Sequence, residues 1–179
     1  NITQIAALSV AQLLEGYGLK PSVKWPNDVL LNGKKISGIF CEMGESDGRV
    51  CGILGIGINV NSTEKSLAGI DLPATSLRCE LRHKIVRLEL LEKLLEIIIN
   101  CFNVLCQSGF SQNRLEIKKR MAFINEHIIF TDVKQDSYPG RIVDLNDDGT
   151  LLFECEKRGI ISLNSGEISF HNSYPMRKY

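Results

Sequence analysis

The residues best suited to chemistry lie in one short stretch, KWPNDVLLNGKKISG, residues 24–38. Asn27 offers a hydrogen-bond donor and an acceptor, and Asp28 offers a carboxylate suited to Mg²⁺ or a ribose hydroxyl. Adjacent strand side chains point to opposite faces, so one of Lys34 and Lys35 faces inward. This alternation predicts that Lys35 shares one face with Ser37 and Ile39. The alternative is that these polar residues only close a turn and solvate an edge strand.

A second candidate is the glycine-rich stretch GILGIGINVN, residues 52–61. Its glycines at 52, 55 and 57 do not have the spacing of a dinucleotide-binding loop, and no Walker A motif is present in the sequence. Glycines inside an apolar strand instead indicate close approach of another backbone or of a ligand. The stretch is therefore either tightly packed sheet or the floor of a binding site.

The elements that must position these residues follow from the apolar spacing. Residues 2–17 have the three- and four-residue spacing of an amphipathic helix, with Gly18 as its C-terminal cap. Four segments rich in Val, Ile and Leu are predicted to form one sheet: 22–25, 29–31, 35–42 and 49–58. Asn32-Gly33 predicts a tight hairpin between the second and third strands, because both residues tolerate positive φ.

The second half of the chain changes character. Helices are predicted over 85–106 and 111–121, and four short alternating runs follow at 128–133, 140–145, 150–156 and 159–163. Regularly spaced short strands indicate a small barrel-like module. The boundary is expected between residues 123 and 126, giving domains 1–125 and 126–179.

Composition limits the classes of partner and the compartment. The 21 basic and 21 acidic residues balance, so no overall field draws the chain to nucleic acid or to a membrane. A membrane-spanning run and a signal peptide are both absent from the sequence, which predicts a cytoplasmic location. The six scattered cysteines predict small buried side chains rather than zinc ligands or disulfides. A first residue of Asn, with helical spacing already running, suggests a fragment.

KWPNDVLLNGKKISGIFCE resembles the signature of biotin protein ligases. The similarity continues in the family's order through GIGINVN (55–61), PATSL (73–77), GRIVDLNDDGTLLFE (140–154) and SGEIS (165–169). The resemblance implies an α+β fold, with a class II synthetase-like mixed sheet followed by a small SH3-like barrel. It also implies the activity: biotin and ATP give biotinyl-5′-AMP, and biotin then passes to a lysine of the biotin carboxyl carrier domain of acetyl-CoA carboxylase.

The resemblance also implies roles for single residues. Lys35 is the catalytic residue and reaches the biotin carboxylate and the α-phosphate, while Gly38 and Gly57 leave room for biotin. The implied ATP contacts are Trp25, Asn27, Asp28 and Asn59, and the implied Mg²⁺ ligands are Asp28 and Asn59. A homodimer through the central sheet is compatible with such a ligase.

One feature of the family has no counterpart in these residues. The family's upstream half contributes a Ser-Thr biotin contact and a Gly-Arg-rich loop that covers the adenylate, and neither run occurs here. We therefore expect this chain to hold the nucleotide side of the site and to transfer biotin poorly by itself. Three alternatives stay open: a lipoate-type ligase, which KWPND and the terminal barrel disfavour, a non-catalytic binding remnant, and an interaction module using the small barrel.

Overall fold

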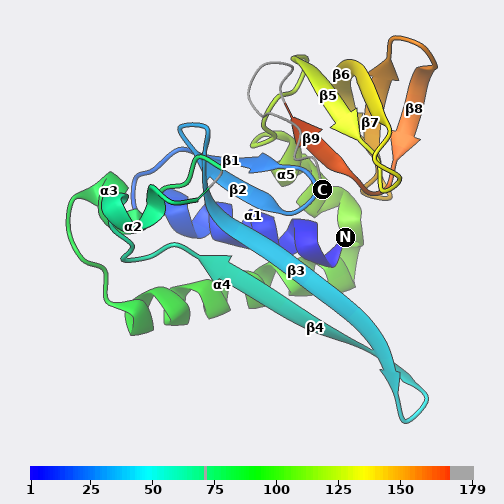
Figure 1. Cartoon of the computed structure of the whole chain (residues 1–179). Coiled ribbons are helices and arrows are strands. Elements are labelled where there is room, and N and C mark those ends of the chain that lie inside the picture. The colour runs from blue at the N-terminus through cyan, green and yellow to red at the C-terminus, as the bar shows by residue number, and fades with distance from the viewer. Residues whose placement is uncertain (71, 170–179) are drawn as a thin grey trace.

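The first part of the chain is an antiparallel sheet with helices packed against it (Figure 1). In the computed structural model, which describes residues 1–70 and 72–169, the strands of this sheet lie in the order β1 (Pro21–Lys24), β2 (Asp28–Leu31), β3 (Lys34–Ser46) and β4 (Arg49–Ile58). The helices are α1 (Ile2–Glu15), α2 (Glu64–Leu67), α3 (Leu77–Leu81), α4 (Arg87–Ser108) and α5 (Phe110–Lys118). α1 lies against the sheet and contacts α4 and α5, while α2 and α3 belong to the connection between β4 and α4.

The core forms where α1 meets the sheet. Ile5, Leu8 and Leu14 are fully buried and share a core cluster with Val29 and Ile39 of the strands. The helix ends two residues before the predicted end, at Glu15 rather than Tyr17. The reason is a turn in which the N–H of Leu19 donates to the carbonyl of Leu14 (3.2 Å), with Gly18 at a φ of 76° that favours glycine.

The predicted hairpin is confirmed. Asn32 and Gly33 have φ values of 51° and 73°, the left-handed conformation of a tight turn between β2 and β3. β3 continues four residues beyond its predicted end at Glu42 and pairs with β4 as a long ribbon, which projects from the body (Figure 1). Asp47 and Gly48, at φ 52° and 70°, close this ribbon with the same turn chemistry.

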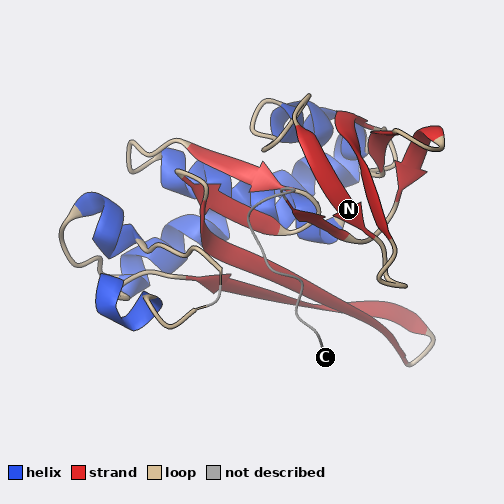
Figure 2. Ribbon diagram, turned by 45° about the horizontal axis from the view of Figure 1, so that its top comes forward, coloured by secondary structure: helices blue, strands red, loops and turns tan. Residues whose placement is uncertain are grey.

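The second sheet is built from the C-terminal strands (Figure 2). Its strands are β5 (His127–Thr131), β6 (Ser137–Leu145), β7 (Leu151–Cys155), β8 (Gly159–Leu163) and β9 (Glu167–Ser169), in the spatial order β8-β7-β6-β5-β9. The four predicted strands are present, and β9 is a fifth that the spacing of apolar runs did not indicate. The predicted α+β fold class with a small C-terminal module is confirmed. The division at residues 125 and 126 stays a prediction, and residues 170–179 lie outside the described part.

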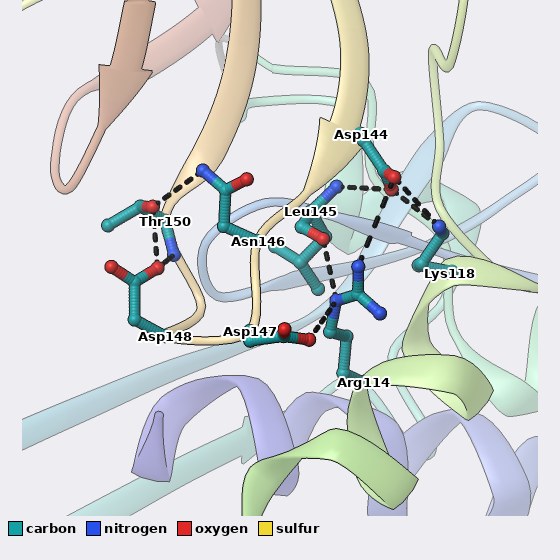
Figure 3. Close-up of polar contacts among 8 residues, drawn as sticks. All are labelled: Arg114, Lys118, Asp144, Leu145, Asn146, Asp147, Asp148 and Thr150. Carbon is teal, nitrogen blue, oxygen red and sulfur yellow. Dashed lines mark hydrogen bonds and ion pairs between the residues drawn. The ribbon is translucent and has the colours of Figure 1, made fainter.

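Charged side chains join the turn between β6 and β7 to α5 (Figure 3). Arg114 donates from Nε to the carbonyl of Leu145 (2.7 Å) and pairs with Asp147 (3.3 Å). One turn further along α5, Lys118 lies 2.7 Å from a carboxylate oxygen of Asp144. Burial alone would raise the pKa of Asp144, but hydrogen bonds from Lys118 and from the Leu145 N–H outweigh it and lower that pKa.

The same turn reaches the core of the first part of the chain. The carbonyl of Gly149 accepts hydrogen bonds from Gln4 Nε2 of α1 (2.7 Å) and from Trp25 Nε1 at the end of β1 (3.1 Å). Gly149 has a φ of 84°, and a Cβ there would lie only 2.2 Å from the side-chain oxygen of Asn1. The turn therefore needs glycine on two grounds, conformation and space. None of the helices in the described residues is long and apolar enough to span a membrane.

Candidate active site

The site is organised by a β-bulge in β3. Val29 pairs with Ser37 and Leu30 pairs with Lys35, so Ile36 is an extra residue on β3. Ile36, Ser37 and Ile39 are all buried, at 0–2% exposure. Because paired residues point to the same side of a sheet, Lys35 lies on the face opposite to Ser37 and Ile39.

The predicted shared face of Lys35, Ser37 and Ile39 is therefore wrong. Strict alternation fails at the bulge, where two successive residues, Ile36 and Ser37, are both buried. The consequence is that Lys35 shares its face with Gly38, which pairs with Asp28 on β2 and with Gly57 on β4. Lys34 pairs with Leu31 and is exposed, so the two lysines do differ in direction as predicted.

Asp28 and Lys35 form an ion pair on this face. Lys35 Nζ lies 2.6 Å from Asp28 Oδ1, and the two side chains are 38% and 15% exposed. A Cβ on Gly38 would lie 3.0 Å from Lys35 Cε and 3.1 Å from its Nζ, so glycine leaves the space that the ammonium occupies. Gly57 is exposed beside Gly38. The structure brings these four residues, Asp28, Lys35, Gly38 and Gly57, together on one face of the sheet.

A second cation lies at this carboxylate and was missed in the sequence. Lys24 is the cross-strand partner of Asp28 in β1 and β2. Burial lowers the pKa of Lys24, while the negative charges of Asp28 and of Glu167 on β9 act in the opposite direction. The turn formed by residues 25–27 could have indicated this neighbour, because such a turn pairs Lys24, the residue before it, with Asp28, the residue after it.

The two asparagines are placed differently. Asn27 Nδ2 donates to the carbonyl of Ile39 (2.7 Å), and the Asn27 carbonyl accepts from the Ile39 N–H (2.9 Å). Asn27 thus ties the turn before Asp28 to β3. The backbone N–H of Asn59 donates to Ile36 at the bulge (2.9 Å), and its side chain makes no hydrogen bond to the described residues. The side-chain amide of Asn59 is therefore available to a ligand.

Trp25 does not lie on the open face. It is 3% exposed, and its indole N–H donates to the carbonyl of Gly149 in the turn between β6 and β7. Its visible role is to attach the WPND turn to the C-terminal module. Its assignment as an ATP contact stays a prediction, as do the other ligand assignments.

A third segment reaches the backbone of Lys35, and sequence reasoning missed it. The Lys35 N–H donates to the carbonyl of Pro73 (2.8 Å), and the Thr75 N–H donates to the carbonyl of Lys35 (2.9 Å). The PATSL segment therefore continues the sheet beside the bulge as a short parallel bridge between Lys35 and Ala74. No local pattern predicts this contact, because about 40 residues separate its two sides.

The donor set fits a Mg²⁺ ion bound together with phosphates. The described residues hold no cluster of three His, Cys, Asp or Glu side chains that could bind a metal alone. Mg²⁺ is usually held by one or two carboxylates plus substrate phosphates. Asp28 supplies one partly exposed carboxylate, and only its Oδ1 is engaged by Lys35 within the described part.

A cavity of about 660 Å³ lies beside the site rather than in it. The hairpin turn, α2 and α3 enclose it, and its lining includes Asn32, Lys34, Thr75, Glu80 and Arg82. Lys35, Gly38 and Gly57 do not line this cavity. The candidate site is instead the open face of the sheet.

The fold and the site match those of a known family of ligases. The sequence model of the Biotin/lipoate A/B protein ligase family matches residues 3–59, and that of the Biotin protein ligase C terminal domain matches residues 123–171. A solved biotin protein ligase from Aquifex aeolicus superposes with a TM-score of 0.80 at 31% identity, over 94% of this chain and 72% of that one. The chain belongs to the biotin protein ligase family.

Curated relatives agree with this assignment. The bifunctional ligase/repressor BirA of Bacillus subtilis (strain 168) is 32% identical over 176 residues, which is 94% of this chain and 52% of the relative. The biotin–[acetyl-CoA-carboxylase] ligase of Paracoccus denitrificans is 30% identical over 85% of this chain and 65% of the relative. The chain thus spans about half to two thirds of the length of these relatives.

Proposed function

We propose that this chain carries the nucleotide-side catalytic part of a biotin protein ligase. The observation that carries the proposal is the ammonium of Lys35, held by Asp28 on an open face with a glycine floor at Gly38 and Gly57. A solved Aquifex aeolicus ligase in complex with biotin and ATP shares the fold with a TM-score of 0.78 at 30% identity. Biotin and ATP are the substrates proposed for the same face here.

The reaction has two steps. A carboxylate oxygen of biotin attacks the α-phosphorus of ATP, pyrophosphate leaves, and biotinyl-5′-AMP results. The amine of an acceptor lysine then attacks the carbonyl carbon of this anhydride, and AMP leaves. Lys35 is proposed to neutralise the carboxylate and to stabilise the charge that grows on the phosphoryl oxygens in the first step. Asp28 fixes the direction of that ammonium.

The remaining assignments belong to the same proposal. Asp28 and Asn59 would hold Mg²⁺, which neutralises phosphate charge when it is bound with ATP. The acceptor is proposed to be the biotin carboxyl carrier domain of acetyl-CoA carboxylase, which the name of the Paracoccus denitrificans relative supports. A homodimer through the central sheet, a cytoplasmic location and the two-domain division are proposals on the same footing.

A second candidate is a non-catalytic binding protein. One observation favours it, namely that the side chain of Lys35 is 38% exposed. A mixed anhydride formed on such a face needs cover from water. Catalysis and binding therefore have to be separated by experiment.

Biotin-dependent exchange of pyrophosphate into ATP tests the proposal in the native protein, including any residues encoded before Asn1. We expect exchange with biotin and none with lipoate. In single-turnover formation of biotinyl-AMP, Lys35→Ala should lower the rate by about 10²–10³, the scale for loss of one preorganised charge-stabilising donor. Lys34→Ala is the matched control, because its side chain leaves the other face. Binding of biotin without exchange would favour the binding protein, and a slow Lys34→Ala variant beside a normal Lys35→Ala variant would refute the assignment.

A further inference from the structure

The connection between β4 and α4 folds back onto the strand that carries Lys35. It leaves the sheet after Asn59, and its two ends are joined by Asn61, whose side chain accepts from the Ile85 N–H (2.9 Å) and donates to the Ile85 carbonyl (2.8 Å). Between these ends, Pro73 and Thr75 form backbone hydrogen bonds to the two sides of Lys35. The backbone of Lys35 is therefore held by a segment that starts beside a predicted nucleotide contact.

One carboxylate joins this segment to the hairpin turn. Glu80 of α3 accepts from the Thr75 hydroxyl at Oε1 (2.6 Å) and from Asn32 Nδ2 at Oε2 (3.1 Å). Thr75 is 3% exposed, so its hydroxyl depends on this partner rather than on water. Asn32 begins the turn that leads to Lys35, and Thr75 lies beside Lys35 in the sheet. Glu80 thus connects the hairpin turn before Lys35 to the segment that forms backbone hydrogen bonds with Lys35.

We propose that Glu80 is a positioning residue for Lys35, acting through Thr75 and Asn32. The bidentate carboxylate fixes the distance between the hairpin turn and the PATSL segment, and this distance sets where the backbone of Lys35 lies. The inference rests on the proposed function, because it gives Lys35 the charge-stabilising role argued above. It assigns a role in the reaction to three side chains that contact neither biotin nor nucleotide in that proposal.

The geometry explains why a positioning device is needed here. Lys35 lies next to the extra residue of the bulge, where the ladder of β2 and β3 is interrupted. The neighbouring strand β4 does not compensate, since its ladder with β3 starts only at Ser37. The bridge to residues 73–75 therefore supplies the backbone bonds that Lys35 lacks on that side.

The test compares Thr75→Val, which removes the hydroxyl at constant shape, with Thr75→Ser, which keeps it. Amide hydrogen exchange followed by NMR reads the two bonds directly, through the N–H groups of Lys35 and residue 75. We expect Thr75→Val to speed both by roughly two- to tenfold, the change expected when one net hydrogen bond is lost. The exchange rate of the Asn59 backbone N–H, which donates to the carbonyl of Ile36 on the other side of the bulge, should not change. Thr75→Ser should restore both rates.

Single-turnover formation of biotinyl-AMP in the native protein is the second readout. Thr75→Val should be slowed about tenfold, as for loss of one oriented interaction worth about 1.4 kcal/mol, and Thr75→Ser should be near normal. Glu80→Gln is a second variant that retains shape, in case Thr75→Val does not fold. Glu64→Gln on α2 is the control, because the Glu64 carboxylate pairs, among the residues that the structure describes, only with the exposed Arg82.

Two results would overturn the positioning role. The first is unchanged exchange at Lys35 in Thr75→Val and Glu80→Gln. The second is faster exchange with an unchanged adenylation rate in those variants while Lys35→Ala is slow. If the unaltered protein forms no adenylate, or if Lys35→Ala is as fast as the unaltered protein, the proposed function fails instead. In that case the exchange of the two amides alone decides whether Glu80 holds this segment.

Discussion

Replacing Gly38 with alanine places a methyl group in tight contact with the end of the Lys35 side chain. The new Cβ would be 3.0 Å from Lys35 Cε, 3.1 Å from its Nζ and 3.4 Å from Asp28 Oδ1. Contacts this short force the flexible lysine to move rather than the sheet. The ammonium should therefore shift by a few tenths of an ångström, which disturbs its 2.6 Å ion pair with Asp28.

The expected effects on stability and on rate differ in size. Alanine in a strand gains roughly 0.5–1 kcal/mol over glycine, and a partly exposed ion pair contributes at most about 1 kcal/mol. These terms oppose each other, so the free energy of unfolding of Gly38→Ala should change by less than about 1 kcal/mol. Adenylation should slow by about tenfold, or roughly 1.4 kcal/mol in the activation free energy, which is less than for Lys35→Ala because the ammonium is displaced and not removed.

Gly57→Ala is the matched control for this substitution. Its Cβ would lie 3.6 Å from the carbonyl of Gly38, an ordinary contact, so Lys35 should be undisturbed and the free energy of unfolding should rise by roughly 0.5–1 kcal/mol. Because Gly57 is a predicted biotin contact, the variant should bind biotin more weakly but react at a near-normal rate once biotin is saturating. The assays are urea unfolding, biotin titration and single-turnover formation of biotinyl-AMP. A normal single-turnover rate in Gly38→Ala would refute the argument that this glycine makes room for the ammonium.

Two further predictions concern the framework. Leu94 on α4 is 7% exposed, so Leu94→Ala should lower the free energy of unfolding by about 2–5 kcal/mol in urea titrations. Leu95 is 49% exposed, so Leu95→Ala should change this free energy far less. Equal effects of the two substitutions would contradict the packing of α4 described above. Because the folded pKa of Asp144 is lowered, its contribution to stability is complete above its unfolded pKa and is lost as the pH falls through the lowered value, below about pH 4. Asp144→Asn should therefore lower the midpoint of thermal unfolding at pH 7, and the difference in midpoint between the variant and the unaltered protein should be smaller at pH 3. The same difference at both pH values would refute the contribution of the Asp144 carboxylate to stability.

Local chemistry made part of this site predictable. The Asn32-Gly33 turn and the strand ends around it depend on neighbours in sequence. The spacing of isoleucines in β3 also indicated the bulge, but the prediction assumed strict alternation of the side chains. Ile36 and Ile39 are three residues apart, and an unbroken strand of period two cannot place both on the same face. Both are buried, at 0% and 2% exposure, and the bulge supplies the extra residue between them.

The remaining features could not be read from the sequence because they depend on distant partners. Trp25 donates to Gly149, which is 124 residues away, so the same aromatic side chain that suggests a ligand contact serves as an anchor between the two sheets. Thr75 and Glu80 lie in a connection without strong periodicity, and their contact with the Lys35 strand exists only after the sheet has formed. Long-range placement, rather than residue type, decides such roles.

Hydrophobic burial and the chemistry of the site are linked through the bulge. Without it, Ile36 would point to the open face and Lys35 toward the core. Full burial of an isoleucine side chain is worth about 1.5–3 kcal/mol, and the interrupted ladder costs about one net hydrogen bond, roughly 1 kcal/mol. The Ile36 carbonyl recovers part of that cost by accepting from the Asn59 N–H at 2.9 Å. The core therefore favours the bulged register, and this register is what turns the ammonium of Lys35 toward Asp28 and Gly38.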